Sequence, residues 1–204
     1  MKKLLLTSAG LSKSLEGLIM EKIRKNPCEI KVLLVPTAST NNDGAREGIS
    51  MCIYKLMSMG ILSENIFVYH LGFLLSKNYT RTYSADVTNV PPLFRILSVQ
   101  EMNQYDLLVF SGGDASVLLS EINRTGFCEV IKQAVENGLF YLGISAGSMV
   151  AAGNFTDSLG FIKNPIFVHS EKGTPCGDLP QYGEVYLTDT QAILIDENFA
   201  QIVE

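Results

Sequence analysis

Residues 140–150 read FYLGISAGSMV, and this stretch decides how the middle of the chain folds. Apolar residues come first, as in a buried strand, and apolar residues return at the end, as in a helix. Between them, GISAG at residues 143–147 matches the pattern G-x-S-x-G. In this strand-to-helix context, the pattern predicts a sharp turn that exposes the hydroxyl of Ser145 above the edge of a sheet.

The ordinary alternative is that Ser145 only caps the following helix, because serine is a favoured N-cap residue. The glycines on both sides favour the turn, since they leave room for a strained backbone at the serine. The helix then begins directly behind Ser145, and its first N–H groups face negative charge that develops on an attacked carbonyl. We therefore interpret Ser145 as a nucleophile and Ala146 as an oxyanion-hole donor.

A serine hydroxyl needs a neighbouring base, and histidine is the usual one. The chain contains two histidines. His70 lies inside the strand-like run FVYHLG, where a core or edge role is expected. His169 ends the run IFVHS, just past a predicted strand, and strand ends of parallel α/β sheets are where ligand crevices form. We expect His169 to be the base.

A second glycine site precedes the serine in LLVFSGGD, residues 107–114. This run predicts a strand that delivers two glycines to the same edge of the sheet, followed by a helix. We expect the N–H of Gly113 to join that of Ala146 in an oxyanion hole. The alternatives are a glycine turn used for tight packing and a phosphate cradle.

Short apolar runs alternate with longer amphipathic stretches along the chain, which predicts an α/β three-layer sandwich with a mostly parallel central sheet. We expect a single domain over residues 1–204, with an irregular excursion at about 72–97. The expected strands are 3–7, 30–36, 66–70, 107–111, 139–144 and 166–169, with 184–188 and 192–196 as a C-terminal β-hairpin, and the expected helices are 12–25, 44–59, 116–123 and 129–137.

The composition favours a soluble, cytoplasmic protein. The chain has 204 residues, 47% of them hydrophobic, which suffices for a sizeable core. Its four cysteines form no C-x-x-C pair, which argues against a zinc site and a disulfide framework and favours reduced thiols. The opening MKKLLL is interpreted as the first strand, because its apolar run ends within a few residues. No run approaches the roughly 20 apolar residues that cross a bilayer.

Charge excludes a further class of partners. The formal net charge is −5 and the pI is about 5.1, and the basic residues are scattered, so no nucleic-acid surface is expected. Small-molecule or peptide partners fit better. A homodimer is compatible with the sequence, with the 72–97 excursion and the C-terminal hairpin as candidate contact elements.

The motifs, in this order, resemble the peptidase E family of aspartyl dipeptidases, together with the cyanophycinases that share its fold. In that family a G-G-G-N segment supplies the oxyanion hole, G-x-S-A-G carries the nucleophile, and a histidine follows in a motif such as N-P-H. The corresponding stretches here are SGGD at 111–114, GISAG at 143–147 and IFVH at 166–169. The opening KKLLLTSAG and the run KVLLVPTAS are also similar, so that the likeness covers most of residues 1–170.

The resemblance implies a flavodoxin-like fold related to the class I glutamine amidotransferases, which carry a cysteine at this nucleophile elbow. It implies a hydrolase, namely a serine protease or dipeptidase that cleaves small peptides through an acyl-enzyme without a metal or cofactor. The main alternative is a catalytically impaired homologue that acts as a binding protein. An ordinary α/β-hydrolase esterase is disfavoured, because its histidine lies far beyond the nucleophile.

The sequence departs from the family at the third catalytic position. The family's aspartate lies in a long loop between serine and histidine, whereas His169 follows Ser145 by only 24 positions. Asp157 is the one carboxylate between them, and we take it as the candidate acid. Glu171 or a backbone carbonyl is the alternative partner of the histidine.

Two further departures concern the oxyanion loop and specificity. Ser111 and Asp114 replace the first glycine and the asparagine of G-G-G-N. The carboxylate of Asp114 would oppose an oxyanion unless its side chain points away. The chain has no arginine after Arg124, so a preference for N-terminal aspartate is not predicted.

Overall fold

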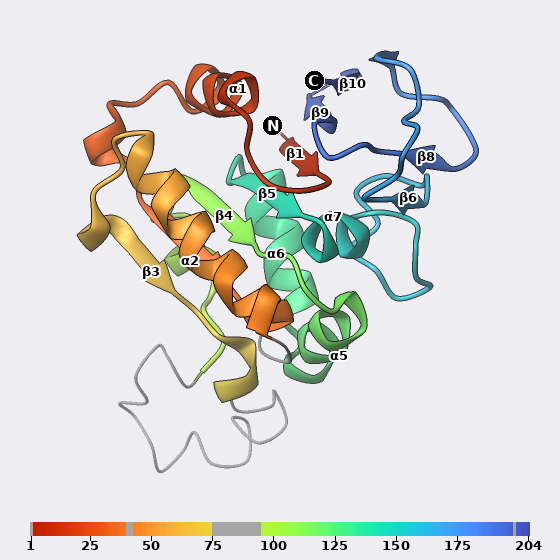
Figure 1. Cartoon of the computed structure of the whole chain (residues 1–204). Coiled ribbons are helices and arrows are strands. Elements are labelled where there is room, and N and C mark those ends of the chain that lie inside the picture. The colour runs from red at the N-terminus through yellow and green to blue at the C-terminus, as the bar shows by residue number, and fades with distance from the viewer. Residues whose placement is uncertain (1, 40–42, 75–94, 198) are drawn as a thin grey trace.

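The computed structural model describes residues 2–39, 43–74, 95–197 and 199–204 (Figure 1). Strands alternate with helices over the first three quarters of the chain, as the sequence predicts, and short strands follow. The strands are β1 (Lys3–Thr7), β2 (Val32–Val35), β3 (Ile66–Val68), β4 (Leu107–Phe110), β5 (Phe140–Ile144), β6 (Ile166–Phe167), β7 (Gly177–Asp178), β8 (Val185–Tyr186), β9 (Ala192–Asp196) and β10 (Phe199–Val203).

Eight of these strands form one sheet in the order β3-β2-β4-β5-β1-β9-β10-β7. The first five are parallel to one another, and β9, β10 and β7 are joined to them by antiparallel pairings. The four residues of β2 and the four of β4 are all buried, as expected for strands covered on both faces. A separate small sheet pairs β6 with β8 in parallel.

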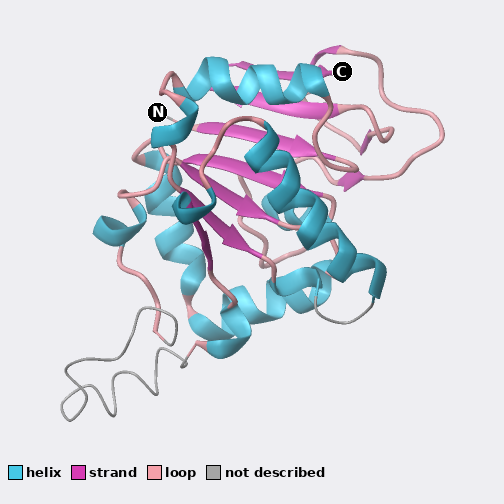
Figure 2. Cartoon of the chain, turned by 60° about the vertical axis from the view of Figure 1, so that its left-hand side comes forward, coloured by secondary structure: helices cyan, strands magenta, loops and turns pink. Residues whose placement is uncertain are grey.

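Helices cover both faces of the large sheet, which gives the expected three layers (Figure 2). On one face, α1 and α2 bury Leu15, Ile19 and Leu56 against the sheet. On the other face, α5, α6 and α7 form a second core that includes Leu118 and Ile131. The helices are α1 (Lys13–Ile23), α2 (Asp43–Ser58), α4 (Val99–Met102), α5 (Ala115–Thr125), α6 (Phe127–Glu136) and α7 (Ala146–Ala151).

The predicted C-terminal hairpin is wrong in its partners. Residues 185–186 form β8, which pairs with β6, and not with 192–196. The antiparallel hairpin joins β9 to β10, a strand that the sequence analysis missed. The hairpin extends the sheet because β9 also pairs with β1, with Thr7 opposite Ala192. Most of the expected excursion at 72–97 lies outside the described residues.

The carboxyl ends of β1, β4 and β5 meet beside α7 (Figure 1). This is the edge where parallel α/β sheets place their ligand sites. None of the helices in the described part of the chain is long and apolar enough to span a membrane.

Candidate active site

The turn between β5 and α7 holds Ser145 in a strained conformation. Its φ is 48° and its ψ is −103°, outside the common regions for a residue with a side chain. Such a conformation costs about 1–3 kcal/mol and persists only where its surroundings fix it. Here the N–H of Ser145 donates to the carbonyl of Thr7 over 2.9 Å, which ties the turn to β1.

The two glycines of the motif are required by close packing. A Cβ atom added to Gly143 would lie 2.7 Å from the main chain of Gly147. One added to Gly147 would lie 2.5 Å from the carbonyl oxygen of Phe110, at the end of β4. The pattern G-x-S-x-G is therefore what allows α7 to start immediately above β5 and against β4.

The side chain of Ser145 makes no cap hydrogen bond to α7. Its Oγ lies 3.2 Å from Nε2 of His169, and Nδ1 of the same ring lies 2.7 Å from Oδ1 of Asp189. When Nδ1 carries the hydrogen and donates it to Asp189, Nε2 accepts from Ser145. The serine contacts the histidine and the histidine contacts the carboxylate, which is the arrangement of a catalytic triad.

Asp189 was missed by the sequence analysis, which chose Asp157. Asp157 is exposed in the turns after α7, and Glu171 is exposed two residues past the histidine; neither bonds to His169. The pairing of Thr7 with Ala192 explains why Asp189, and not Asp157, lies next to His169. Since β9 runs antiparallel to β1, the turn that precedes β9 lies at the carboxyl end of β1, beside the serine and the histidine.

The histidine and its carboxylate partner are open to solvent. The side chains of His169 and Asp189 are 53% and 65% exposed. His169 also has a positive φ of 55°, a left-handed conformation that is uncommon for residues other than glycine. Its position therefore depends on a few hydrogen bonds rather than on burial.

The loop after β4 is built to orient one peptide group. The hydroxyl of Ser39 donates to the carbonyl of Gly112 over 2.5 Å and lies 2.7 Å from the hydroxyl of Ser111. Because the N–H and C=O of a trans peptide point in opposite directions, the N–H of Gly113 faces away from Ser39. Gly113 itself has a φ of 130°, and an added Cβ would lie 2.0 Å from the carbonyl oxygen of Ala38.

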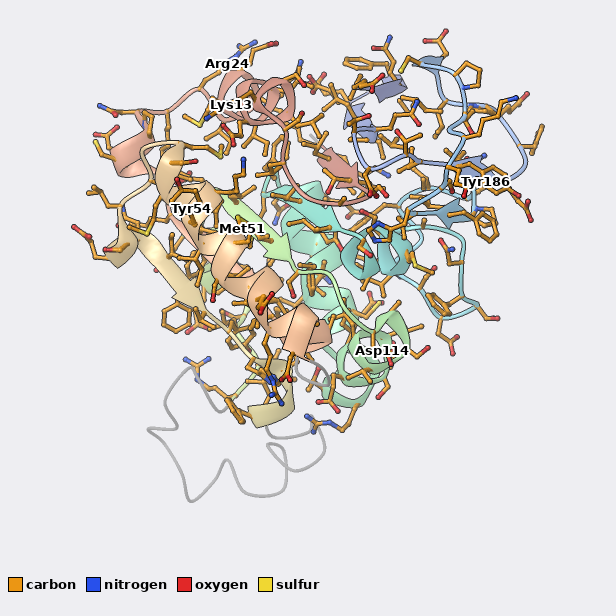
Figure 3. All side chains as sticks on the ribbon, viewed as in Figure 1. Lys13, Arg24, Met51, Tyr54, Asp114 and Tyr186 are labelled. Carbon is orange, nitrogen blue, oxygen red and sulfur yellow. The ribbon has the colours of Figure 1, made fainter. Side chains whose placement is uncertain are left out.

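The carboxylate of Asp114 does not oppose an oxyanion at this loop. It caps α5, where Oδ1 accepts the N–H groups of Ser116 and Val117 over 2.8 and 3.1 Å. Figure 3 labels Asp114 at the start of this helix. The side chain of Asp114 is thus directed to the N-terminus of α5, as is required of an aspartate next to an oxyanion hole.

A cavity of about 320 Å³ adjoins Ser145 and runs under α2. Among the lining residues that the structure describes, Lys55 carries the one fixed positive charge, and buried Glu16 lies 3.5 Å from it. Burial raises the pKa of the Cys52 thiol to about 12, so this thiol stays protonated. The lining residues are Ser8, Ala9, Gly10, Leu11, Ser39, Gly44, Ala45, Gly48, Met51, Cys52, Lys55, Ser111, Gly112, Gly113, Ile144, Ser145 and His169.

The second histidine has a local structural role. Nδ1 of His70 accepts the N–H of Gly72 over 3.0 Å, and the ring packs against Phe73. Desolvation lowers the pKa of His70. Within the described ranges, no group of three or more histidine, cysteine, aspartate or glutamate residues is placed to hold a metal ion.

Three comparisons connect the chain to known proteins. The model of Peptidase family S51 matches residues 89–166. An uncharacterized peptidase of Pasteurella multocida is 41% identical over 92 residues, which are 45% of this chain and 39% of that protein. Peptidase E of Streptomyces coelicolor is 35% identical over 68 residues, which are 32% of this chain and 28% of that protein. The chain therefore covers less than half the length of these curated relatives.

The fold has a close counterpart among solved structures. A crystal structure of a putative peptidase E protein from Listeria monocytogenes matches with a TM-score of 0.67 and 21% identity, over 100% of this chain and 98% of that one. The predicted fold class is confirmed by this match. The resemblance to peptidase E, inferred from three short motifs, is confirmed by the sequence matches and the family model.

Proposed function

We propose that the chain, which resembles peptidase E in sequence and in fold, is a serine peptidase that cleaves small peptides through an acyl-enzyme. The observation that carries the proposal is the continuous set of contacts from Ser145 Oγ through the ring of His169 to Asp189. A hydroxyl paired with an imidazole, which a carboxylate holds in turn, is the arrangement that activates a serine.

The chemistry follows from these positions. Ser145 Oγ attacks the peptide carbonyl while Nε2 of His169 takes the hydroxyl proton, and Asp189 stabilises the imidazolium that forms. The N–H groups of Gly113 and Ala146 bind the oxyanion. The intermediate then collapses, His169 gives the proton to the leaving amine, and the acyl group stays on Ser145. Water, activated by the same histidine, releases the acid and restores the hydroxyl.

The cavity beside Ser145 supports a small peptide as the substrate. Its volume of about 320 Å³ is at the small end of ordinary ligand pockets. Lys55 is the charged residue of the described lining apart from the histidine, and Glu16 partly offsets its charge. The other described lining residues are apolar, small, or polar and neutral. We therefore propose peptides with uncharged side chains, processed in the cytoplasm, where the four free cysteines stay reduced.

A catalytically impaired binding protein is the weaker candidate. The reason to consider it is that the long, acid-bearing loop of the family is missing between Ser145 and His169. Asp189, which follows His169 in the chain, provides a carboxylate within 2.7 Å of the ring. This contact supports a complete triad over an impaired site.

The direct experiment is turnover of a peptide library. The purified protein is incubated with mixed dipeptides and tripeptides, beside a sample first treated with a fluorophosphonate, and both are followed by mass spectrometry. We expect cleavage of a subset of peptides, labelling of Ser145 alone, and no cleavage after labelling. Absence of cleavage together with an unlabelled Ser145 would refute the proposal.

Filling the cavity should block substrate without disturbing the fold. Gly48 lies on α2 and lines the cavity, and a Cβ added there meets no atom within 4 Å. We expect Gly48→Leu to lower kcat/KM at least about tenfold, mainly through KM, because the leucine occupies substrate space. Removing a helical glycine should also stabilise α2 by about 0.5–1 kcal/mol, measured as a higher Tm.

Gly17→Leu is the matched control for this substitution. Gly17 is an exposed glycine of α1 with equally open space, and it does not line the cavity. We expect the same gain in Tm and unchanged kinetics. Equal kinetic effects of the two variants would show that the cavity under α2 does not receive the substrate.

A further inference from the structure

The end of β1 holds all three members of the candidate triad through two consecutive residues. Thr7 contributes its carbonyl oxygen, which accepts the N–H of Ser145 over 2.9 Å. Ser8 contributes its hydroxyl, which accepts the N–H of His169 over 2.7 Å and donates to Oδ1 of Asp189 over 3.4 Å. Ser8 thus hydrogen-bonds both to the main chain of the histidine and to the carboxylate of the aspartate.

The hydroxyl of Ser8 belongs to a buried residue and is not a surface group. Ser8 is 0% exposed, whereas His169 and Asp189 are largely exposed. It lies at the end of a strand that is paired on both sides, with β5 and with β9. A buried hydroxyl thus forms one hydrogen bond to each of two residues whose side chains are exposed.

Both partners of Ser8 need such an anchor. His169 adopts a left-handed conformation at a φ of 55°, and the bond to its N–H fixes the main chain at that point. Asp189 projects from a tight turn in which the N–H of Gln191 donates to the carbonyl of Thr188 over 3.1 Å. The N–H of Ser8 reaches the carbonyl of Gln191 over 3.4 Å, so the residue contacts this turn at two places.

We propose that Ser8 is a positioning residue of the peptidase site, which sets the distance between His169 and Asp189 and aims the imidazole at Ser145. The inference rests on the proposed function. Ser8 takes no part in proton transfer to the substrate, because its hydroxyl is bonded to the main chain of the histidine and to the carboxylate, and not to a ring nitrogen. It acts through the two residues that it orients.

The test is Ser8→Ala, compared with Ser8→Thr, which retains the hydroxyl. A loss of alignment at the reacting groups should lower kcat/KM about 10- to 100-fold, with most of the effect in kcat. We expect partial or full rescue in Ser8→Thr. The low-field proton signal of His169 Nδ1–H in NMR spectra should weaken or broaden in Ser8→Ala and return in Ser8→Thr, which a purely structural role would not produce.

A double-mutant cycle gives a second readout. If Ser8 acts through the two residues that it orients, the loss of kcat in the double variant Ser8→Ala with Asp189→Asn should be clearly smaller than the product of the two single losses; a full product would contradict the inference. Thr125→Val is the control for loss of a buried hydroxyl, because Thr125 is fully buried in α5 and bonds only to carbonyls of its own helix. Its kinetics should match those of the wild type.

The outcomes separate this inference from the proposed function. A wild-type protein whose Ser145 neither labels nor turns over peptides refutes the peptidase itself. A wild type that is active beside a Ser8→Ala variant with unchanged kcat and an unchanged Nδ1 signal refutes the role of Ser8 alone. Should Ser8→Ala fail to fold, Ser8→Cys replaces the hydroxyl by a thiol, which is a much weaker donor and acceptor, so kcat should still fall; a kcat equal to that of the wild type would overturn the inference.

Discussion

Replacing either Ser145 or His169 with alanine is expected to lower kcat/KM about a millionfold, to the level set by substrate binding and the oxyanion hole. Without Ser145 no acyl-enzyme forms, and without His169 the hydroxyl keeps its proton. Because the two groups act in the same step, the double variant should be no slower than either single one. The measurement is single-turnover kinetics on the best peptide from the library.

Two variants serve as controls. His70→Ala removes the other histidine, whose ring accepts the N–H of Gly72. Ser170→Ala removes a hydroxyl next to His169 that donates to the carbonyl of Phe167 over 3.1 Å. We expect small losses of stability, about 1 kcal/mol for His70→Ala, and kinetics within about threefold of the wild type. A loss that follows His70 rather than His169 would invalidate the assignment of the base.

Asp189→Asn is expected to lower kcat about 10⁴-fold while leaving the fold intact. An amide NH₂ next to Nδ1 favours the ring tautomer that carries its hydrogen on Nε2, and that nitrogen then no longer accepts the proton of Ser145. Since Asp189 is 65% exposed, its replacement should change Tm little. Steady-state kinetics and thermal unfolding of the same samples test both statements.

The matched comparison is with the carboxylates nearer to the histidine in sequence. Asp157→Asn and Glu171→Gln remove one charge each, as Asp189→Asn does, and both residues are exposed and form no hydrogen bond with the imidazole. We expect wild-type kinetics from both. A 10⁴-fold loss in Asp157→Asn with an active Asp189→Asn would restore the acid that the sequence analysis chose.

The sequence predicted those parts of the site that depend on local structure. The strand, turn and helix around Ser145 are encoded within residues 140–150, and each glycine there is required by packing over a few ångströms. His169 was correctly chosen as the residue beside Ser145, but the strand before it, β6, pairs with β8 in a separate small sheet and not in the large parallel sheet. The presence and approximate positions of the buried strands were also predictable from their apolar runs, although β2 spans Val32–Val35 and not the expected 30–36.

The parts that failed depend on pairing between distant segments. Asp189 reaches the histidine only because β9 pairs antiparallel to β1, with Thr7 opposite Ala192. The residues around Asp189 do not by themselves indicate this register. The turn between the apolar runs 184–188 and 192–196 favoured a local hairpin instead. The same non-local pairing places the hydroxyl of Ser8 beside the aspartate.

The central claim is that Ser145, His169 and Asp189 form one working triad, and a crystal structure of the protein after reaction with a phosphonate ester tests it most directly. We expect the phosphorus bonded to Ser145 Oγ, a phosphonyl oxygen within hydrogen-bond distance of the N–H groups of Gly113 and Ala146, and Asp189 still bonded to the ring of His169. An unmodified Ser145, or an adduct with His169 turned away from Asp189, would contradict the account.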